Sequence, residues 1–336
     1  MPSPTVRDLA AAVIYRLVTP ALAGQATCTA AEPLAGGSYA AVWRCRLSTG
    51  VDVVVKVAPA TDVPVLTYES SLVDAEAEYF TLLCEHAPGV PVPRVLHVGH
   101  DDEFGDWLVM THLDGDPLSE RAGTNDDFVR RELGAAIARV HRIPYGSFGY
   151  SGARPHGATW PDAFRAIVEA LLMDAATWAV PLGGLARDIE GLLDRHATAL
   201  ALVTRPHVVH FDLWDGNVLA TGDREGRLSG LVDGERWLAG DPLIDFVSPA
   251  LFRRIEDEAD NPFVAGYTEV AANPLLEPGA RQRIALYRMF LYLLMAVEAP
   301  SRGRGGAGDA EWPKFLHGLL SEEVSGLQQL PVHPLG

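Results

Sequence analysis

The chain has 336 residues and a formal net charge of −17 at pH 7, with 48% hydrophobic and 21% charged residues. This composition is ordinary for a folded globular protein with room for two domains. The acidity argues against nucleic acid as a partner, because phosphate contacts need dense lysine and arginine. No apolar stretch approaches the length expected of a membrane span. The three cysteines are odd in number and lack metal-binding spacing, which predicts a protein of the reducing cytoplasm.

The first third of the chain predicts a small sheet and two helices. Apolar residues recur at helical spacing near the N-terminus, which indicates an amphipathic surface helix: Val6, Leu9, Val13, Ile14 and Leu17. Segments 33–47 and 51–59 predict two strands joined by the turn 48–50, and 72–87 predicts a helix. Two further strands are expected at 92–100 and 106–113. We therefore expect a β-rich unit over residues 1–112.

From residue 113 onward the pattern is mainly helical. Apolar residues recur at i, i+3 or i+4, and i+7 in four segments: 128–143, 160–180, 185–203 and 281–299. Only 206–240 interrupts them, with short strand-like pieces. The sequence therefore predicts an α+β chain, with a small β-rich N-terminal part and a larger helical part over 113–336.

A dense group of polar side chains lies between two apolar segments, in the stretch HFDLWDGN at 210–217. Asp212 and Asn217 lie five residues apart, and Gly216 is expected to permit a tight bend. Asp233 follows sixteen residues after Asn217, at the end of another apolar run. Amide and carboxylate oxygens suit Mg²⁺, so Asn217 and Asp233 are candidate ligands, while Asp212 stays free to accept a hydrogen bond from a hydroxyl. Alone, this spacing is weak evidence, because an Asx-rich turn shares it.

Lys56 lies in the middle of the β-branched run VVVKVAP. An ammonium group in such a run loses solvation unless it meets an anion. An edge-strand lysine that reaches solvent is the alternative. The chain uses 25 arginines but only two lysines, so a lysine retained here favours a specific anion-binding role.

These residues, together with GDPLIDF at 240–246, resemble in order and spacing the aminoglycoside phosphotransferase family, with its related fructosamine, choline and homoserine kinases. The resemblance covers nearly the whole chain. It implies a bilobal protein-kinase-like fold that transfers the γ-phosphoryl group of ATP or GTP to a hydroxyl, with Mg²⁺. Asp212 would be the catalytic residue. Lys56 would contact the nucleotide phosphates and be held by Glu76, with Glu78 as an alternative.

The resemblance implies roles for further residues. In the loop GGSYAAV (36–42), backbone groups would cover the phosphates, at Gly37, Ser38 and Tyr39. Met110 and His112 would bind the purine as a hinge. His210 and Asp245 would support the catalytic loop, and His141 is expected to be a core histidine. Two positions depart from the family pattern: Phe211 replaces the usual glycine and is expected to reshape the floor near the acceptor, and Gly234 replaces an aromatic residue and is expected to loosen the metal loop.

The leading hypothesis is an O-phosphotransferase acting on a small molecule. An aminoglycoside or nucleoside-type antibiotic is the first candidate acceptor, and a sugar, fructosamine or choline-like metabolite is the second. A non-catalytic nucleotide-binding protein on the same fold is the alternative from another class. A protein kinase is disfavoured, because the segment between Asp233 and Asp245 leaves little room for an activation loop. The acidic segment 255–260 would suit a cationic acceptor, unless it is a solvated helix face. The sequence leaves open the acceptor, the choice between ATP and GTP, and whether the protein is a monomer or a homodimer.

Overall fold

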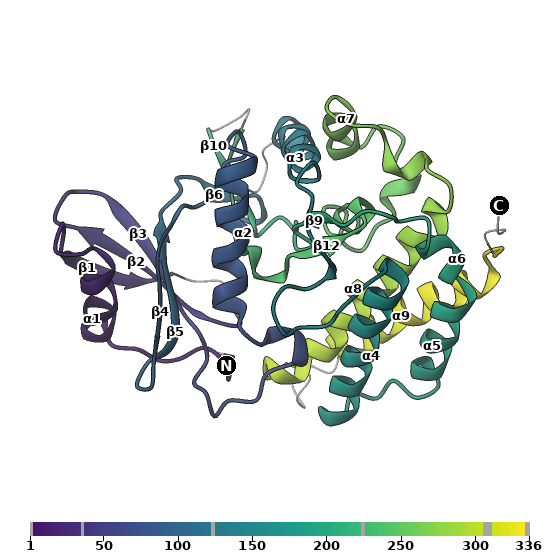
Figure 1. Cartoon of the computed structure of the whole chain (residues 1–336), viewed down its shortest axis with the longest axis horizontal. Helices are drawn as coiled ribbons and strands as arrows, with labels where there is room; N and C mark the ends of the chain where they lie inside the picture. Colours follow the sequence, from purple (N-terminus) through teal and green to yellow (C-terminus); the bar gives the residue numbers. More distant parts are fainter. Residues whose placement is uncertain (1–2, 35–36, 122–124, 223–225, 305–310, 333–336) are drawn as a thin grey trace.

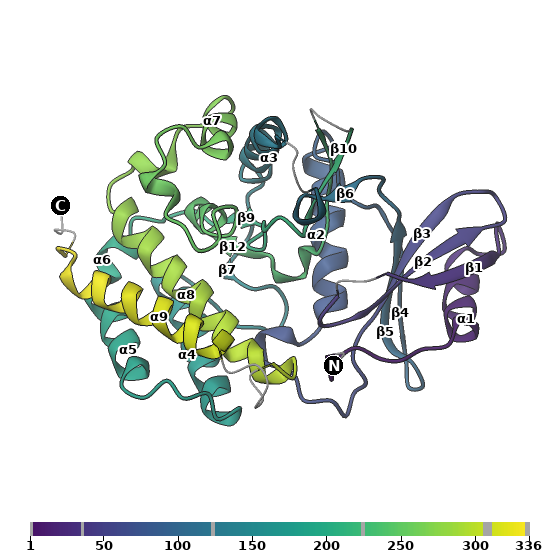
Figure 2. The ribbon, with the colours of Figure 1, turned by 180° about the vertical axis from the view of Figure 1, so that it is seen from behind.

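The computed structural model describes residues 3–34, 37–121, 125–222, 226–304 and 311–332 (Figure 1). An N-terminal β-sheet is followed by a mainly helical region. Figures 1 and 2 show the sheet at one end of the molecule, most helices at the other, and α2 between them. The expected α+β arrangement, with a small β-rich part and a larger helical part, is confirmed.

The sheet has five antiparallel strands in the order β1-β2-β3-β5-β4. Their bounds are β1 Cys28–Pro33, β2 Ala41–Leu47, β3 Asp52–Val57, β4 Val95–Asp101 and β5 Gly105–Thr111. Helix α1 (Ala11–Ala21) packs on one face, where alternate residues of β3 such as Val55 join its core. Because side chains alternate along a strand, Lys56 points to the opposite face, which α2 (Leu72–His86) covers.

The helical region is built around α8 (Ala280–Ser301), which packs against α4, α6 and α9. The other helices are α3 Asp127–Val140, α4 Trp160–Thr177, α5 Leu185–Arg195, α6 Ala197–Leu200, α7 Pro262–Thr268 and α9 Glu311–Gln329. The predicted helix 185–203 is divided at His196, whose Nε2 lies 3.0 Å from a carbonyl of α9. The sequence pattern does not predict helix α9.

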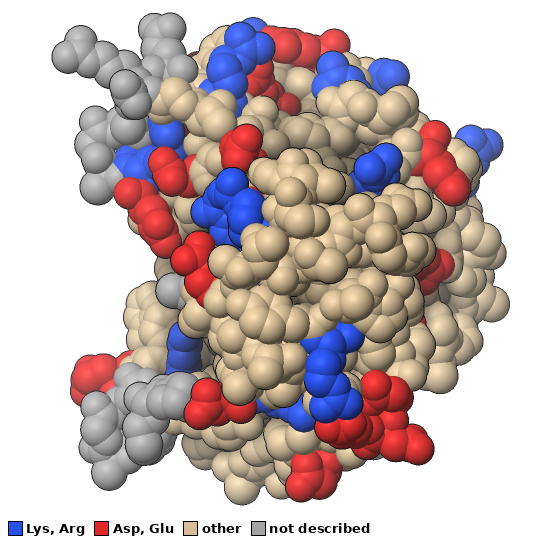
Figure 3. All heavy atoms as spheres, turned by 90° about the vertical axis from the view of Figure 1, so that its left-hand side faces the viewer, with Lys and Arg blue, Asp and Glu red and all other residues tan. Residues whose placement is uncertain are grey.

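Within the described chain, α8 alone is long and apolar enough, by length and composition, to cross a membrane. This differs from the expectation that no stretch approaches that length. However, 83% of its apolar window is buried inside the protein, so α8 is the central core helix here. Figure 3 shows the end of the molecule that carries the sheet, where basic and acidic side chains are interspersed and the described residues form no continuous basic surface.

Short elements join the two parts. Seven short strands form two small sheets, β11-β10-β6 and β8-β7-β12-β9: β6 Asp116–Pro117, β7 Phe148–Gly149, β8 His156–Gly157, β9 His207–Val209, β10 Val218–Thr221, β11 Arg227–Leu231 and β12 Leu238–Gly240. The chain also contains short 3-10 helices: η1 Thr67–Glu69, η2 Leu118–Glu120, η3 Gly234–Arg236, η4 Pro242–Phe246, η5 Ile255–Asp257 and η6 Pro274–Leu276. The strand-like character predicted for 206–240 is therefore confirmed.

Helices α3 and α7 cross with their backbones in direct contact. A Cβ atom added to Gly134 of α3 would collide with the carbonyl of Phe263, and one added to Gly266 of α7 would collide with the carbonyl of Arg131. Backbone atoms have little freedom to move aside, so both positions require glycine. The crossing fixes α3, which ends beside His141.

We expect Gly266→Ala to lower the free energy of unfolding by about 1–3 kcal/mol, because the added methyl group overpacks this crossing. Gly191→Ala is the matched control: it lies in α5, where an added Cβ would meet no neighbouring atom, and it should stabilise the protein by about 0.5–1 kcal/mol. Urea unfolding of both variants measures the difference. Equal stabilities would contradict the backbone contact.

Candidate active site

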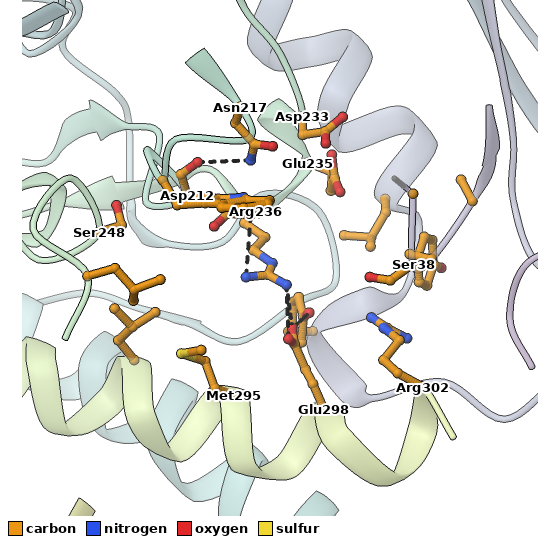
Figure 4. A pocket seen from close by; sticks show the side chains of 18 of the residues that line it. Ser38, Asp212, Asn217, Asp233, Glu235, Arg236, Ser248, Met295, Glu298 and Arg302 are labelled. Atoms are coloured by element: carbon orange, nitrogen blue, oxygen red, sulfur yellow. Dashed lines mark hydrogen bonds and ion pairs between the residues drawn. The ribbon is translucent and has the colours of Figure 1, made fainter. Parts of the chain in front are cut away.

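The candidate catalytic loop lies at the end of a short hairpin. The stretch 210–217 follows β9, and β10 then pairs antiparallel with β11. The N–H group of Val232 donates a hydrogen bond of 3.1 Å to the carbonyl of Asn217. The hairpin therefore brings Asn217, just before β10, beside Asp233, which follows β11 (Figure 4).

A buried carboxylate holds this loop. Asp245, in η4, accepts hydrogen bonds from the backbone N–H groups of His210 at 3.0 Å and Phe211 at 2.6 Å. Nε2 of His141 lies 2.9 Å from the same carboxylate. The His210 ring accepts the N–H group of Asp212 at Nδ1 (3.2 Å) and donates from Nε2 to the main chain that follows β11 (3.1 Å). Together these bonds fix the backbone that carries Asp212.

Phe211 and Gly216 both occupy constrained positions in this loop. Phe211 has a φ of +69°, in the left-handed region that favours glycine, and its ring stacks on Phe290 of α8 with centroids 5.1 Å apart. Its side chain is buried away from the cavity described below, so it does not form a floor beside the acceptor. Gly216 has no left-handed backbone; a Cβ atom there would collide with the ring of Trp214. Gly216 does lie in a tight turn, as the sequence predicts, because the N–H group of Asn217 donates a hydrogen bond of 2.9 Å to the carbonyl of Trp214.

The segment after β11 is tightly constrained. Asp233 has a φ of +58°, so a non-glycine residue again occupies the left-handed region. A Cβ atom on Gly234 would collide with the ring of Tyr79 in α2. The expectation that Gly234 loosens this loop is therefore wrong. The missing side chain lets α2 pack directly against the loop that carries Asp233.

Lys56 contacts three carboxylates. Its Nζ lies 2.6 Å from Glu76 on α2 and 3.5 Å from Glu235 in η3, and it donates a short hydrogen bond to Oδ1 of Asp233. The side chain is only 8% exposed, so these groups replace most of its water. Glu78, the alternative partner, instead accepts a hydrogen bond of 2.7 Å from a tyrosine hydroxyl.

The charges of this cluster are unbalanced. Burial acts to lower the pKa of Lys56, but Asp233, Glu235 and Glu76 outweigh it and raise that pKa well above its usual value. Burial raises the pKa of the Glu76 carboxyl, and the neighbouring ammonium offsets this only in part. With all three carboxylates ionised, the cluster carries an excess of two negative charges; protonation of Glu76, whose pKa is raised to about 8, reduces the excess to one. In a poorly solvated site, such an excess favours binding of a proton or of a further cation.

A second ion-paired group lies beside Asp212. The guanidinium of Arg236 is 3.4 Å from the Asp212 carboxylate and 2.8 Å from Glu298 of α8, and Figure 4 shows it between the two. Burial raises the pKa of Asp212, and Arg236 acts to lower it. Burial acts to lower the pKa of Arg236, but Asp212 and Glu298 raise it well above its usual value. Sequence reasoning missed Arg236, because one arginine among 25 carries no signal of its own.

These side chains meet at one cavity of about 420 Å³. Seven of the predicted site residues line it: Gly37, Ser38, Tyr39, Lys56, Asp212, Asn217 and Asp233. Glu76 lies behind Lys56. Met110 and His112, the predicted hinge, do not line the cavity: Met110 is buried, and the N–H group of His112 donates to the carbonyl of Asp52 at 3.4 Å. Gly36, also in the predicted loop, lies outside the described residues.

Arg236 crosses the middle of the cavity. In Figure 4, Ser38 and Arg302 lie on one side of it, and Ser248 and Met295 lie on the other. Ser38 belongs to the loop after β1, and Met295 belongs to α8. Arg236 thus divides the cavity into a part beside Ser38 and Arg302 and a part beside Ser248 and Met295.

The donor atoms at one end fit a divalent cation. The amide nitrogen of Asn217 donates to a loop carbonyl at 2.9 Å, which leaves its amide oxygen available. Oδ1 of Asp233 accepts the hydrogen bond from Lys56, which leaves Oδ2 available to bind a cation. Within the described chain, Oε2 of Glu235 is buried without a hydrogen-bond partner. Glu76, Asp233 and Glu235 present carboxylate oxygens within 4.8 Å of one another. Such an oxygen-rich set suits Mg²⁺.

Comparison with known proteins identifies the family. The model of the phosphotransferase enzyme family, APH, matches residues 30–286. An aminoglycoside 3'-phosphotransferase of Streptomyces fradiae is 28% identical over 233 residues, which cover 68% of this chain and 80% of that protein. A candidate fructosamine-3-kinase of Thermobifida fusca has a crystal structure with a TM-score of 0.70 and 24% identity, over 94% of this chain and 99% of that chain.

An aminoglycoside 2''-phosphotransferase in complex with GDP and kanamycin has the same fold, with a TM-score of 0.58, 17% identity, and coverage of 94% of this chain and 99% of that chain. The fold is therefore the α+β protein-kinase-like fold of these enzymes. Because the family model matches more than half of its length, the chain belongs to the APH phosphotransferase enzyme family.

Proposed function

We propose that this phosphotransferase moves the γ-phosphoryl group of ATP or GTP, with Mg²⁺, to a hydroxyl group of a small molecule. One observation carries the proposal: Lys56, Asp212, Asn217 and Asp233, far apart in the sequence, line a single cavity. The complete set argues against a non-catalytic nucleotide-binding protein. Nucleotide consumption, measured with ATP and with GTP over antibiotics and polyhydroxylated metabolites, tests the activity.

The nucleotide would lie between residues 1–112 and 113–336, which act as two lobes. Lys56, held by Glu76, would neutralise phosphate charge. Backbone N–H groups of the loop at 37–39 would approach the phosphates, as in other anion-binding turns. The hydroxyl of Thr5 donates to the carbonyl of Ser38 at 2.8 Å, which supports this loop from outside. Purine contacts at Met110 and His112 would require an opening beside the sheet, since neither lines the cavity.

Asn217 and Asp233 would hold Mg²⁺, with Glu235 close by, whose buried Oε2 accepts no hydrogen bond and lies 3.5 Å from the Lys56 ammonium. When bound, the ion supplies positive charge that offsets the developing charge on the phosphates. The excess negative charge around Lys56 favours this cation. His210 and Asp245 would keep the loop in the conformation that presents Asp212.

Asp212 would orient the acceptor hydroxyl and accept its proton. The acceptor oxygen then bonds to the γ-phosphorus, and the bond from that phosphorus to the bridging oxygen breaks. The bridging oxygen keeps the electron pair and leaves with the nucleoside diphosphate. Catalysis of this kind depends mainly on positioning and charge compensation. Arg236 would hold the Asp212 carboxylate in place and keep its pKa from rising further.

Two biological roles are consistent with this chemistry. The similarity to an aminoglycoside 3'-phosphotransferase supports inactivation of an antibiotic, and the similarity to a candidate fructosamine-3-kinase supports a metabolite kinase. The nucleoside triphosphate donor and the free cysteines both suit the cytoplasm.

Asp212→Asn should lower kcat at least ~10²-fold while nucleotide affinity stays nearly intact, because the variant keeps the shape but loses the proton acceptor. Asp215→Asn, in the same loop, is the control. Its carboxylate pairs with Arg130 at 2.8 Å outside the main cavity, so turnover should stay within a few-fold of wild type. Steady-state turnover and nucleotide titration provide both readouts. Near-normal turnover by Asp212→Asn would remove it from the catalytic role.

Glu76→Gln should lower kcat/KM for the nucleotide by about 10–100-fold, since Lys56 loses one charged hydrogen bond that fixes its ammonium. Glu85→Gln, an exposed position on the same helix, should change it less than about twofold. Initial rates at varied nucleotide concentration compare the two variants. Similar effects of both would mean that Glu76 does not hold the lysine.

The dependence of acceptor kcat/KM on pH should report the ionisation of the Asp212 carboxyl. Its carboxylate form accepts the proton, and burial raises its pKa, so acceptor kcat/KM should fall as pH drops through a value above the usual aspartate range. Arg236→Met removes a cation that lowers this pKa, so the acidic limb should move to higher pH. Arg187→Met, at an exposed arginine of α5, should leave the limb unchanged. An acidic limb that stays in place in Arg236→Met would disprove the coupling.

A further inference from the structure

The part of the cavity beside Ser248 and Met295 has an apolar wall. Leu251 and Phe252 follow Ser248 in the chain, and Leu291 lies one helical turn before Met295 on α8; these residues and Trp312 all line the cavity. The Trp312 ring packs edge-on against Phe252 with centroids 6.1 Å apart. Apolar and aromatic linings of this kind are typical of small-molecule sites.

Carboxylates in the described lining are already paired. Asp212 and Glu298 both contact Arg236, and Asp233 and Glu235 both contact Lys56. None of the described residues on the apolar wall is acidic. An acceptor whose ammonium groups faced this wall would therefore lose hydration, because the wall itself offers no anionic partner.

The acidic segment 255–260 does not supply the missing charge. Glu256 pairs with Arg288 at 2.7 Å, and Glu258 pairs with Arg253 at 2.8 Å. No residue of this segment lines the cavity. In the described structure this segment therefore lies outside the cavity that contains Asp212.

Phe252 is held in a conformation that has an energetic cost. Its φ is +65°, and its side chain stays 37% exposed although it packs against Tyr292, Trp312 and Phe315. Strained residues of this kind persist where the surroundings fix them, and they cluster at ligand-binding positions.

We propose that the acceptor is an uncharged, hydroxyl-bearing molecule with an apolar face. That face packs on Leu251, Phe252, Leu291, Met295 and Trp312, while a hydroxyl reaches Asp212. The inference rests on the proposed function, because it takes Asp212 as the residue that meets the hydroxyl. It separates this chain from its aminoglycoside-acting relative in substrate class.

Three probes test the proposal by calorimetric titration of the full chain with Mg²⁺ and a non-hydrolysable ATP or GTP analogue present. Methyl β-D-glucopyranoside and 2-naphthyl β-D-glucopyranoside offer the same ring hydroxyls but differ in the apolar group, and kanamycin is a polycation. The naphthyl glucoside should bind at least about tenfold more tightly than the methyl glucoside, because its ring system covers the apolar wall. Kanamycin should bind more weakly than the naphthyl glucoside.

Phe252→Gly should remove most of this tenfold advantage, because glycine accepts the left-handed φ while the ring is lost. Met295→Gln, of similar length, should reduce it at least about threefold without an added cavity. Phe128→Ala, at an exposed phenylalanine of α3 away from the cavity, should leave it intact. Thermal melting confirms that each variant folds.

Three results would overturn the inference: tighter binding of kanamycin than of the naphthyl glucoside, no difference between the two glucosides, or an undiminished difference in both wall variants. A further measurement on the same samples distinguishes a wrong acceptor class from a wrong proposed function. A thermal shift with Mg²⁺ and the nucleotide analogue depends on the nucleotide and cation residues and not on the apolar wall. Its absence would refute the nucleotide site, whereas its presence without the glucoside preference would refute only the acceptor class.

Discussion

The buried ammonium of Lys56, surrounded by more carboxylates than it can neutralise, is the interaction on which the rest of the site depends. Glu76 comes from α2, Asp233 and Glu235 come from the segment after β11, and Lys56 comes from the sheet. One charge cluster therefore joins the N-terminal sheet to the helical region. Its excess of negative charge, in a poorly solvated place, supports the proposal that it binds a cation together with phosphate groups. Burial and repulsion between the carboxylates raise the pKa of Glu76, so bound cation would compete with a bound proton.

Hydrogen bonds and close packing hold the loop that carries Asp212 in a fixed position relative to this cluster. Asp245 holds the backbone on either side of the His210–Phe211 peptide, and the His210 ring ties the catalytic loop to the segment that carries Asp233. Phe211 and Asp233 both adopt left-handed backbone, and each such residue costs about 1–3 kcal/mol unless its surroundings fix it. The stacking of Phe211 on α8 and the close packing of α2 on Gly234 provide that support.

The order of apolar and polar residues along the chain predicts those features of the site that depend on neighbouring residues. The β-branched run around Lys56 predicts its strand, and the polar stretch at 210–217 between apolar runs predicts a loop whose ends meet at the hairpin. The sequence misses Arg236, because its importance arises only when the segment after β11 brings it against Asp212 and α8 supplies Glu298. The reason for Gly234 is tertiary as well, since the ring of Tyr79 in α2 lies where its side chain would be. Met110 lies in a predicted strand, yet in the structure it pairs with strands on both sides and its side chain is buried in the core, so it does not line the cavity.

A crystal structure with Mn²⁺ and a non-hydrolysable nucleotide analogue tests the central claim most directly, because anomalous scattering locates the metal. The account predicts one Mn²⁺ bound by the side-chain oxygens of Asn217 and Asp233, with Lys56 turned from Asp233 toward a phosphate while it keeps its contact with Glu76. Metal and phosphates bound away from these residues, with the Lys56–Asp233 ion pair unchanged, would contradict it.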